Sequence, residues 1–233
     1  MVQVDQFRPS PLHILEPLHR IGWLSEQSED LKLWIAANGR WRTVASGQPV
    51  YLSGDDADGL YGIGTGALDI QYVPDSLRSD VWIRAQPGGW LGQEALMPTM
   101  PRVFNLIAGV DSRVYFVPRH ALRFLLQERP DMWPQLYALA ILQSRRLMEL
   151  LYDALLLSPD SRLARLLLRL SVTTPKITAT QHDLCALLGM PRSSLRRSLK
   201  SLQEAGAIST SYRTIEVVDP VLLKRLSSEP AEP

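Results

Sequence analysis

Residues 178–208 read TATQHDLCALLGMPRSSLRRSLKSLQEAGAI, and this stretch decides the fold of the C-terminal region. Thr178 followed by Gln181 predicts a capping box, so we expect a helix to begin one or two residues after Thr178. Gly189 can take the left-handed conformation that ends a helix, and Pro191 favours the first turn of the next one. A helix, a short glycine turn and a second helix are the layout of a helix-turn-helix.

The second helix of this stretch separates its charged and apolar side chains. At about 100° per residue, one side carries the leucines Leu195, Leu199 and Leu202. The other side carries Arg192, Ser193, Arg196, Arg197 and Lys200. Such a helix can bury its leucines and place its cations in a major groove, where arginine donates two hydrogen bonds to guanine O6 and N7. The alternative is a solvated basic face on a structural helix, and the capped first helix and Gly-x-Pro turn weigh against it.

The sequence around this motif also favours a nucleic-acid partner. Gly206 is placed to end the second helix, and residues 207–210 and 214–218 predict a two-stranded wing around Tyr212-Arg213. Residues 160–226 carry a net charge of +6, whereas the whole chain carries +1. A basic segment on a nearly neutral chain is typical of an electrostatic footprint for double-stranded DNA.

The first half of the chain has a different pattern, in which short apolar runs alternate with glycine and aspartate turns. The runs are 49–52, 60–63, 67–73, 81–85, 90–91, 103–110 and 113–117. This punctuation predicts an antiparallel β-roll or sandwich, so the fold class is α+β. Similar rolls hold catalytic metals in cupin enzymes, which need paired histidines. No histidine lies between Trp41 and Val117, which argues against that chemistry.

Helical patterns flank the roll. We expect helices within 11–38 and over 120–127, and a longer one that begins at Pro130. Apolar positions of the long helix recur every three or four residues, at Trp133, Leu136 or Tyr137, Ala140, Ser144, Leu147, Leu151 and Ala154. This seam predicts a homodimer, and packing of the helix on its own roll is the alternative. Ser158–Ser161 breaks the helix and predicts a hinge.

These patterns divide the chain into four segments. We expect a β-roll sensor domain over 1–129, a dimerisation helix over 130–157, a winged helix-turn-helix over 158–226 and a disordered tail over 227–233. No apolar run is long enough to span a membrane, and Met1–Ser10 lacks the apolar core of a secretory signal. We therefore expect a cytoplasmic protein without a membrane partner.

The sequence also limits the chemistry that the chain can perform. Cys185 is the single cysteine, which excludes an intramolecular disulfide and an iron–sulfur cluster or zinc site made of cysteines alone. No nucleophile elbow, phosphate loop or metal-ligand spacing is present. We predict that the protein is not an enzyme and has no metal site and no resident cofactor.

The chain resembles the Crp/Fnr family of bacterial transcription regulators, the cAMP receptor protein type, from about Leu12 to Leu226. The run that begins Gly47-x-Pro-Val-Tyr-Leu is similar to the family's opening strands, and Gly189 to Leu202 is similar to its helix-turn-helix signature. The resemblance implies a sequence-specific DNA-binding regulator that forms a homodimer, with one subunit on each half of a pseudo-palindromic site. RNA polymerase would be a partner if the regulator activates transcription.

The resemblance also implies roles for individual residues. Arg192 and Arg197 would read bases, and Thr180, Gln181 and Ser194 would hold phosphates, which position a protein without reading sequence. The chain departs from the family at Ser193, where a glutamate is common. For this reason the family's usual half-site is not assumed, and Arg196 adds a further cation. A binding module that no longer reads DNA is an alternative function, and the cationic face argues against it.

The larger departure lies in the effector pocket, which the resemblance places at Gly92, Gln93, Glu94, Arg102 and Val103. Cyclic-nucleotide-binding members carry glutamate where this chain has Gln93. They carry small residues where this chain has Val103 and Phe104, and we expect these larger side chains to fill the space for the phosphate. Glu94 would replace the missing carboxylate only if it faced the other side of a strand. We therefore expect that cAMP is not the effector, and a cAMP-responsive regulator is the alternative.

Effectors other than cAMP can also be judged from the residues present. Arg102 is compatible with a structural ion pair and with a site for a small organic anion, and the absence of any effector is a third possibility. A haem would need an axial ligand such as His13, His19 or His120, each of which we interpret as an ordinary surface or capping residue. An iron–sulfur cluster is excluded by the cysteine count.

Overall fold

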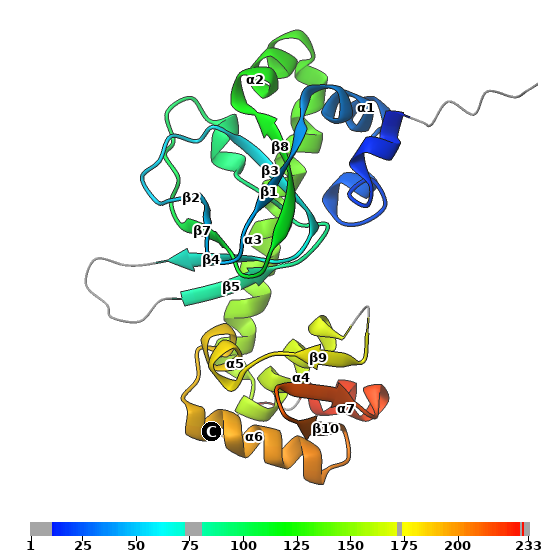
Figure 1. Cartoon of the computed structure of the whole chain (residues 1–233), viewed down its shortest axis with the longest axis vertical. Helices are drawn as coiled ribbons and strands as arrows, with labels where there is room; N and C mark the ends of the chain where they lie inside the picture. Colours follow the sequence, from blue (N-terminus) through cyan, green and yellow to red (C-terminus); the bar gives the residue numbers. More distant parts are fainter. Residues whose placement is uncertain (1–10, 73–80, 172–173, 229, 231–233) are drawn as a thin grey trace, which may run out of the picture. The chain divides into compact units, whose positions relative to one another are not determined.

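The computed structural model describes residues 11–72, 81–171, 174–228 and 230 of the chain. The chain divides into two compact units, Met1–Gln143 and Ser144–Pro233. In Figure 1 the strands of the first unit are coloured from blue to green, and the helices and strands of the second unit from yellow-green to red. Among the described residues, no helix combines the length and the hydropathy that a membrane span requires.

The first unit begins with short helical segments. They are two 3-10 turns, η1 (Pro11–Leu15) and η2 (Trp23–Glu26), and the helix α1 (Glu29–Asn38). The prediction of helix within 11–38 is therefore correct only in part. Pro17 and Gly22 lie between these segments, and Gly22 has a positive φ of 73°, a conformation that interrupts a helix.

The described strands of this unit form two antiparallel sheets. The strands are β1 (Arg40–Val44), β2 (Pro49–Tyr51), β3 (Gly59–Thr65), β4 (Leu68–Tyr72), β5 (Val81–Ala85), β6 (Trp90–Leu91), β7 (Asn105–Ala108) and β8 (Ser112–Pro118). One sheet has the order β1-β8-β3-β6 and the other the order β2-β7-β4-β5. The predicted antiparallel roll is confirmed.

Strand β8 shows why the central strands read as continuous apolar runs. Val114 and Phe116 belong to the core between the two sheets. Tyr115 and Val117 point to the opposite face and pack against the helices. Successive side chains of a strand alternate between faces, and both faces of β8 are covered.

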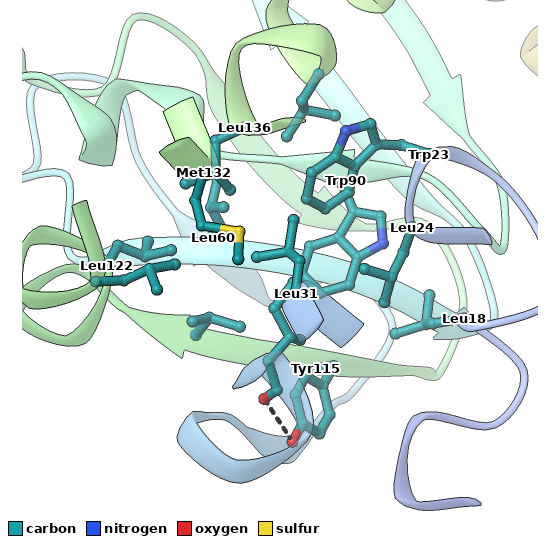
Figure 2. Close-up of a cluster of buried hydrophobic side chains, with 14 of the residues drawn as sticks. Leu18, Trp23, Leu24, Leu31, Leu60, Trp90, Tyr115, Leu122, Met132 and Leu136 are labelled. Atoms are coloured by element: carbon teal, nitrogen blue, oxygen red, sulfur yellow. Dashed lines mark hydrogen bonds between the residues drawn. The ribbon is translucent and has the colours of Figure 1, made fainter. Parts of the chain in front are cut away.

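The second core lies between this sheet and the helices that cover it, and Figure 2 shows its side chains. The rings of Trp23 and Trp90 meet edge to face at 5.5 Å. Tyr115 donates a hydrogen bond of 2.9 Å to the Ala36 carbonyl, which ties α1 to β8. The helices α2 (Arg119–Glu128) and α3 (Trp133–Leu156) follow the roll, and the 3-10 turn η4 (Pro130–Met132) separates them.

Helix α3 crosses from the first unit into the second. Its residues Leu136 and Leu139 are buried in the core of the first unit. A row of exposed residues follows the helix with alternating spacings of four and three: Tyr137, Ile141, Ser144, Met148, Leu151 and Leu155. The row contains Tyr137, Ser144 and Leu151 of the predicted seam. Leu136, the alternative to Tyr137, is buried in the core, and the seam residue Leu147 is 56% exposed beside the row.

The second unit is built around a leucine-rich core. Its further elements are α4 (Pro159–Leu170), β9 (Lys176–Thr178), α5 (Gln181–Leu188), α6 (Arg192–Glu204), β10 (Ile208–Ser211), β11 (Thr214–Val217) and α7 (Pro220–Leu226). The hydroxyl of Ser158 caps α4 by accepting from the Ser161 amide at 3.2 Å. The predicted wing is present, and the strand order β10-β11-β9 adds β9 to it as a third strand that the sequence did not predict.

The end of the chain is described only in part. Ser227, the first residue of the predicted disordered tail, is buried, and its hydroxyl donates to the Lys224 carbonyl at 2.7 Å. Pro230 pairs with Leu157 in an isolated β-bridge. Residues 229 and 231–233 of the predicted tail lie outside the described residues.

Candidate functional site

The first helix of the helix-turn-helix begins at a capping box that lies two residues after the predicted one. The Thr180 hydroxyl accepts from the Asp183 amide at 3.1 Å, and the Asp183 carboxylate accepts from the Thr180 amide at 3.0 Å. Thr178 belongs to β9, where it is paired with Thr214. The cap is therefore Thr180 with Asp183, not Thr178 with Gln181, and α5 starts at Gln181.

The turn between α5 and α6 follows the prediction. Gly189 has a φ of 57°, in the left-handed region. Pro191 is the N-cap of α6, one position before the first helical turn where it was expected. Arg162 of α4 donates a hydrogen bond to the Leu188 carbonyl and so ties down the end of α5. These contacts fix the angle at which α6 leaves the turn.

Helix α6 presents its cations to solvent. Leu195, Leu199 and Leu202 are buried in the core of the second unit. The opposite face is exposed and consists of Arg192, Ser193, Arg196, Arg197 and Lys200. Within the described part of the chain, the only ion pair recorded for these side chains joins Lys200 to Glu204 at 3.5 Å. An exposed guanidinium without an internal partner is available to bind base edges or phosphates.

A cleft of about 640 Å³ lies between α6 and the wing. Gln181 and Arg196 line it on the helical side, and Tyr212 and Arg213 line it on the wing side. Tyr212 is 86% exposed, and Arg213 has a positive φ of 56° at the tip of the β10–β11 hairpin. Sequence reasoning located this hairpin but assigned no binding role to its two tip residues.

The residues predicted to hold phosphates are in different environments. Gln181 is exposed at the first position of α5. Ser194 is half-buried, in the first turn of α6. The Thr180 hydroxyl is half-buried and donates to the Asp183 carboxylate at 2.8 Å, so its proton is already used by the cap. The phosphate contacts of these three residues stay predictions.

In the roll, Arg102 is completely buried and bound by the protein itself. Its Nη2 donates to Asp58 Oδ1 at 2.7 Å and to the Gly59 carbonyl at 2.8 Å. Its Nη1 donates to Glu94 Oε2 at 3.2 Å. The guanidinium lies 4.1 Å from the centre of the Tyr51 ring. These contacts form the ion pair that is one of the two states of Arg102 compatible with the sequence.

A second arginine completes this charge cluster. Arg42 Nη1 lies 3.9 Å from Asp58 Oδ2, and it donates to the Tyr61 hydroxyl at 3.3 Å. Tyr61 in turn donates to Asp58 Oδ2 at 2.7 Å. Two guanidinium groups therefore face two carboxylates. Burial raises the pKa of Tyr51, and burial together with the Asp58 hydrogen bond raises the pKa of Tyr61, so both phenols stay neutral.

Two expectations about this pocket need correction. Glu94 lies in the 3-10 turn η3 (Gln93–Leu96), not in a strand, so the alternation of strand faces does not keep its carboxylate away from Arg102. Val103 is 43% exposed and so does not fill the pocket, whereas Phe104 packs against the Tyr51 ring at 5.8 Å. Gly92 has a φ of 97°, and a Cβ there would lie 2.7 Å from Arg102 Nη1, so glycine lets the arginine approach.

Asp58 is the partner of Arg102 that sequence reasoning missed. It lies in the run of glycines and aspartates that predicts a turn, 44 residues before Arg102. Turn aspartates are common, and nothing local distinguishes one that binds a distant arginine. Among the described residues, no group of three histidine, cysteine, aspartate or glutamate side chains is placed to hold a metal ion.

Comparison with known proteins agrees with both halves of this description. Residues 41–129 match the family described as the cyclic nucleotide-binding domain, and residues 161–226 match the Crp-like helix-turn-helix domain. The cyclic AMP receptor protein of Thermus thermophilus is 26% identical over 191 residues, which are 80% of this chain and 87% of that protein. The HTH-type transcriptional regulator Cmr of Mycobacterium tuberculosis is 28% identical over 207 residues, which are 87% and 79% of the two chains.

The fold is shared with solved structures. FixK2 from Bradyrhizobium japonicum superposes with a TM-score of 0.70 at 19% identity, and covers 83% of this chain and 99% of its own. The two matched domains occur here in the order of the roll followed by the helix-turn-helix, and the relatives extend over both. The chain therefore belongs to the Crp/Fnr family of DNA-binding transcription regulators.

Proposed function

We propose that this regulator binds a pseudo-palindromic DNA site as a homodimer, reads bases through α6, and is not controlled by cAMP. The observation that carries the proposal is the state of Arg102, whose guanidinium is bound by Glu94, Asp58 and the Gly59 carbonyl. A cyclic nucleotide would need this cation for its phosphate. It would have to displace a carboxylate that is only 4% exposed.

Charge balance supports the same conclusion. An anionic ligand gains binding energy where the site carries an excess of positive charge. Here Arg42 and Arg102 are matched by Asp58 and Glu94, so the cluster offers no net cation. Removal of a buried carboxylate from its arginine leaves an uncompensated charge, which costs several kcal/mol. A small anion is therefore disfavoured as well as cAMP.

The opposite possibility has one observation in its favour. The relative from Thermus thermophilus is named a cyclic AMP receptor protein, and it aligns with most of this chain. A cAMP-responsive regulator is therefore the second candidate function. It requires Glu94 to leave Arg102 when the nucleotide binds, and a comparison of DNA affinity with and without cAMP separates the two candidates.

The proposed contacts with DNA follow from exposure. Arg192 and Arg197 lie on the exposed face of α6 and are proposed to read bases, with Ser193 and Arg196 between them. Lys200 lies farther along the same face. We assign Gln181 and Ser194 to phosphates, because the end of a helix at which amides are unpaired attracts anions. Thr180 makes its predicted phosphate contact only if the phosphate displaces Asp183, whose carboxylate accepts from both the amide and the hydroxyl of Thr180.

The proposed dimer rests on the exposed row of α3. Met148, Leu151 and Leu155 are 65%, 50% and 68% exposed. Isolated exposed apolar residues are normal, whereas a continuous row at heptad spacing is the pattern that packs against a second helix. A second copy of the chain offers the same row, and a two-fold dimer presents two recognition helices to the two halves of a palindrome.

Replacement of Arg197 by alanine tests base reading. We expect affinity for a site selected by the wild-type protein from random DNA to fall about tenfold to a hundredfold, because one bidentate arginine–guanine contact contributes ~1–3 kcal/mol. Affinity for unrelated DNA should fall by less than about threefold. Fluorescence anisotropy at fixed salt measures both. Arg123→Ala, an exposed arginine on α2 of the first unit, is the control for loss of one cation outside the proposed interface and should change neither affinity by more than about twofold. An equal loss on both DNAs would show that Arg197 contacts phosphate alone.

A further inference from the structure

We infer that Asp153 is a positioning residue for DNA binding, because it locks the end of α3 to the winged helix-turn-helix. The inference rests on the proposed homodimer. In a dimer that associates along α3, the orientation of each recognition helix depends on the joint between α3 and α4. The chain breaks at this joint, and the sequence alone predicts a hinge there, at Ser158–Ser161.

Asp153 reaches across the break to α4. Its side chain is 9% exposed, and its carboxylate accepts a hydrogen bond from Arg165 Nη1. The second oxygen, Oδ2, lies 3.8 Å from Arg169 Nη1. Burial lowers the pKa of Arg169, and the Asp153 carboxylate opposes this effect. One buried anion therefore holds two arginines on successive turns of α4.

Arg165 and the first turn of α4 also bind the C-terminal end of the chain. Arg165 Nε donates to the Ser227 carbonyl at 3.0 Å. Ser161, in the first turn of α4, donates from its hydroxyl to the Leu226 carbonyl at 2.6 Å. Leu157, at the break itself, is buried and pairs with Pro230. All of these contacts lie within the second unit, so residues 144–156 of α3 belong to the same compact body as the helix-turn-helix.

The predicted hinge is thus bridged on both sides by polar contacts. Rotation about Ser158 would separate Asp153 from Arg165, and a buried carboxylate without its partner is costly. The two recognition helices of a dimer must match half-sites about 34–36 Å apart. A locked joint holds that separation at one value, whereas a free joint would allow several. Asp153 therefore contributes to the choice of half-site spacing without touching DNA.

The test uses the full-length protein and the variants Asp153→Asn, Asp153→Glu and Glu149→Gln. Asparagine keeps the shape and removes the charge, and glutamate restores the charge. Glu149 is the matched control, because it is an exposed acid on α3 one turn before Asp153, paired with Arg145 at 3.3 Å. Three DNAs are compared by anisotropy: two selected half-sites at the preferred spacing, the same half-sites with two extra base pairs between them, and one half-site.

We expect D153N to lose about tenfold to a hundredfold of its affinity for the preferred spacing, the range of a charged hydrogen bond. Its affinity for one half-site should change by less than about threefold. The ratio between preferred and lengthened spacing should fall towards one, which a general loss of stability would not produce. D153E should recover at least part of the ratio, and E149Q should keep it.

Two other results have distinct meanings. A wild-type protein that distinguishes the spacings, beside a D153N variant that distinguishes them equally well, would overturn the positioning role alone. A wild-type protein that binds one half-site as tightly as two would overturn the proposed dimer and, with it, the positioning role. Hydrogen exchange gives an independent reading, because D153N should speed exchange of the amides at Leu157–Arg162 and leave those of α6 unchanged.

Discussion

Replacement of Arg102 by alanine is expected to lower the free energy of unfolding of the N-terminal unit by about 3–5 kcal/mol. The variant leaves Glu94, which is 4% exposed, as a buried carboxylate without its cation. It also removes the contacts with the Gly59 carbonyl and the Tyr51 ring. If Arg102 were instead a vacant ligand site, the loss of a buried cation without a partner would leave stability unchanged or improved.

Urea unfolding followed by tryptophan fluorescence measures the free energy of unfolding of the N-terminal unit. All six tryptophans of the chain lie before residue 144, so the signal reports the unit that contains Arg102. Arg123→Ala, an exposed arginine on α2, is the control and should change stability by less than about 0.5 kcal/mol. A loss of under about 1 kcal/mol for R102A would contradict the ion-pair account.

The dimer gives the second large effect. Leu151→Asp should raise the dissociation constant of the dimer by on the order of a thousandfold or more. A two-fold interface contains the residue twice, and each copy loses ~2 kcal/mol of apolar burial and gains a charge that must be desolvated. Because Leu151 is 50% exposed in the single chain, the fold of the subunit should be unaffected.

Sedimentation over a range of protein concentrations measures the association. Phe124→Asp is the matched control, because Phe124 is 62% exposed on α2 and lies outside the α3 row. L151D should sediment as a monomer, and the wild-type protein and F124D as dimers. A dimer that survives L151D would show that the subunits associate through another surface. A wild-type protein that sediments as a monomer would show that the proposed dimer is wrong.

The helix-turn-helix is predictable from sequence because its signals are local. Gly189 and Pro191 mark the turn within three residues, and the leucine and arginine faces of α6 follow from the helical period. The capping residue is less certain from sequence, because Thr178 with Gln181 and Thr180 with Asp183 both have the required spacing. Tertiary structure decides between them, since Thr178 is taken into the pairing of β9 with β11.

The effector pocket is less predictable because its partners are distant in sequence. The motif identifies Arg102, but its pairing with Asp58 depends on how the roll closes. The role of Glu94 depends on the local backbone. In the 3-10 turn η3 its carboxylate reaches Arg102, whereas in a strand its side chain would point to the opposite face of the sheet. Similarly, several rows on α3 have heptad spacing, and the burial of Leu136 in the core leaves Tyr137 as the exposed alternative at that point of the helix.

In this DNA-binding regulator Glu94 and Asp58 bind the arginine that a cyclic nucleotide would need, and we therefore expect DNA binding that is independent of cAMP. Fluorescence anisotropy of the purified protein on DNA from upstream of its own gene, with and without cAMP, tests it most directly. We expect salt-sensitive binding with a dissociation constant that cAMP changes by less than about twofold. Binding that appears only when cAMP is added would contradict the claim, because Glu94 would then yield Arg102 to the nucleotide.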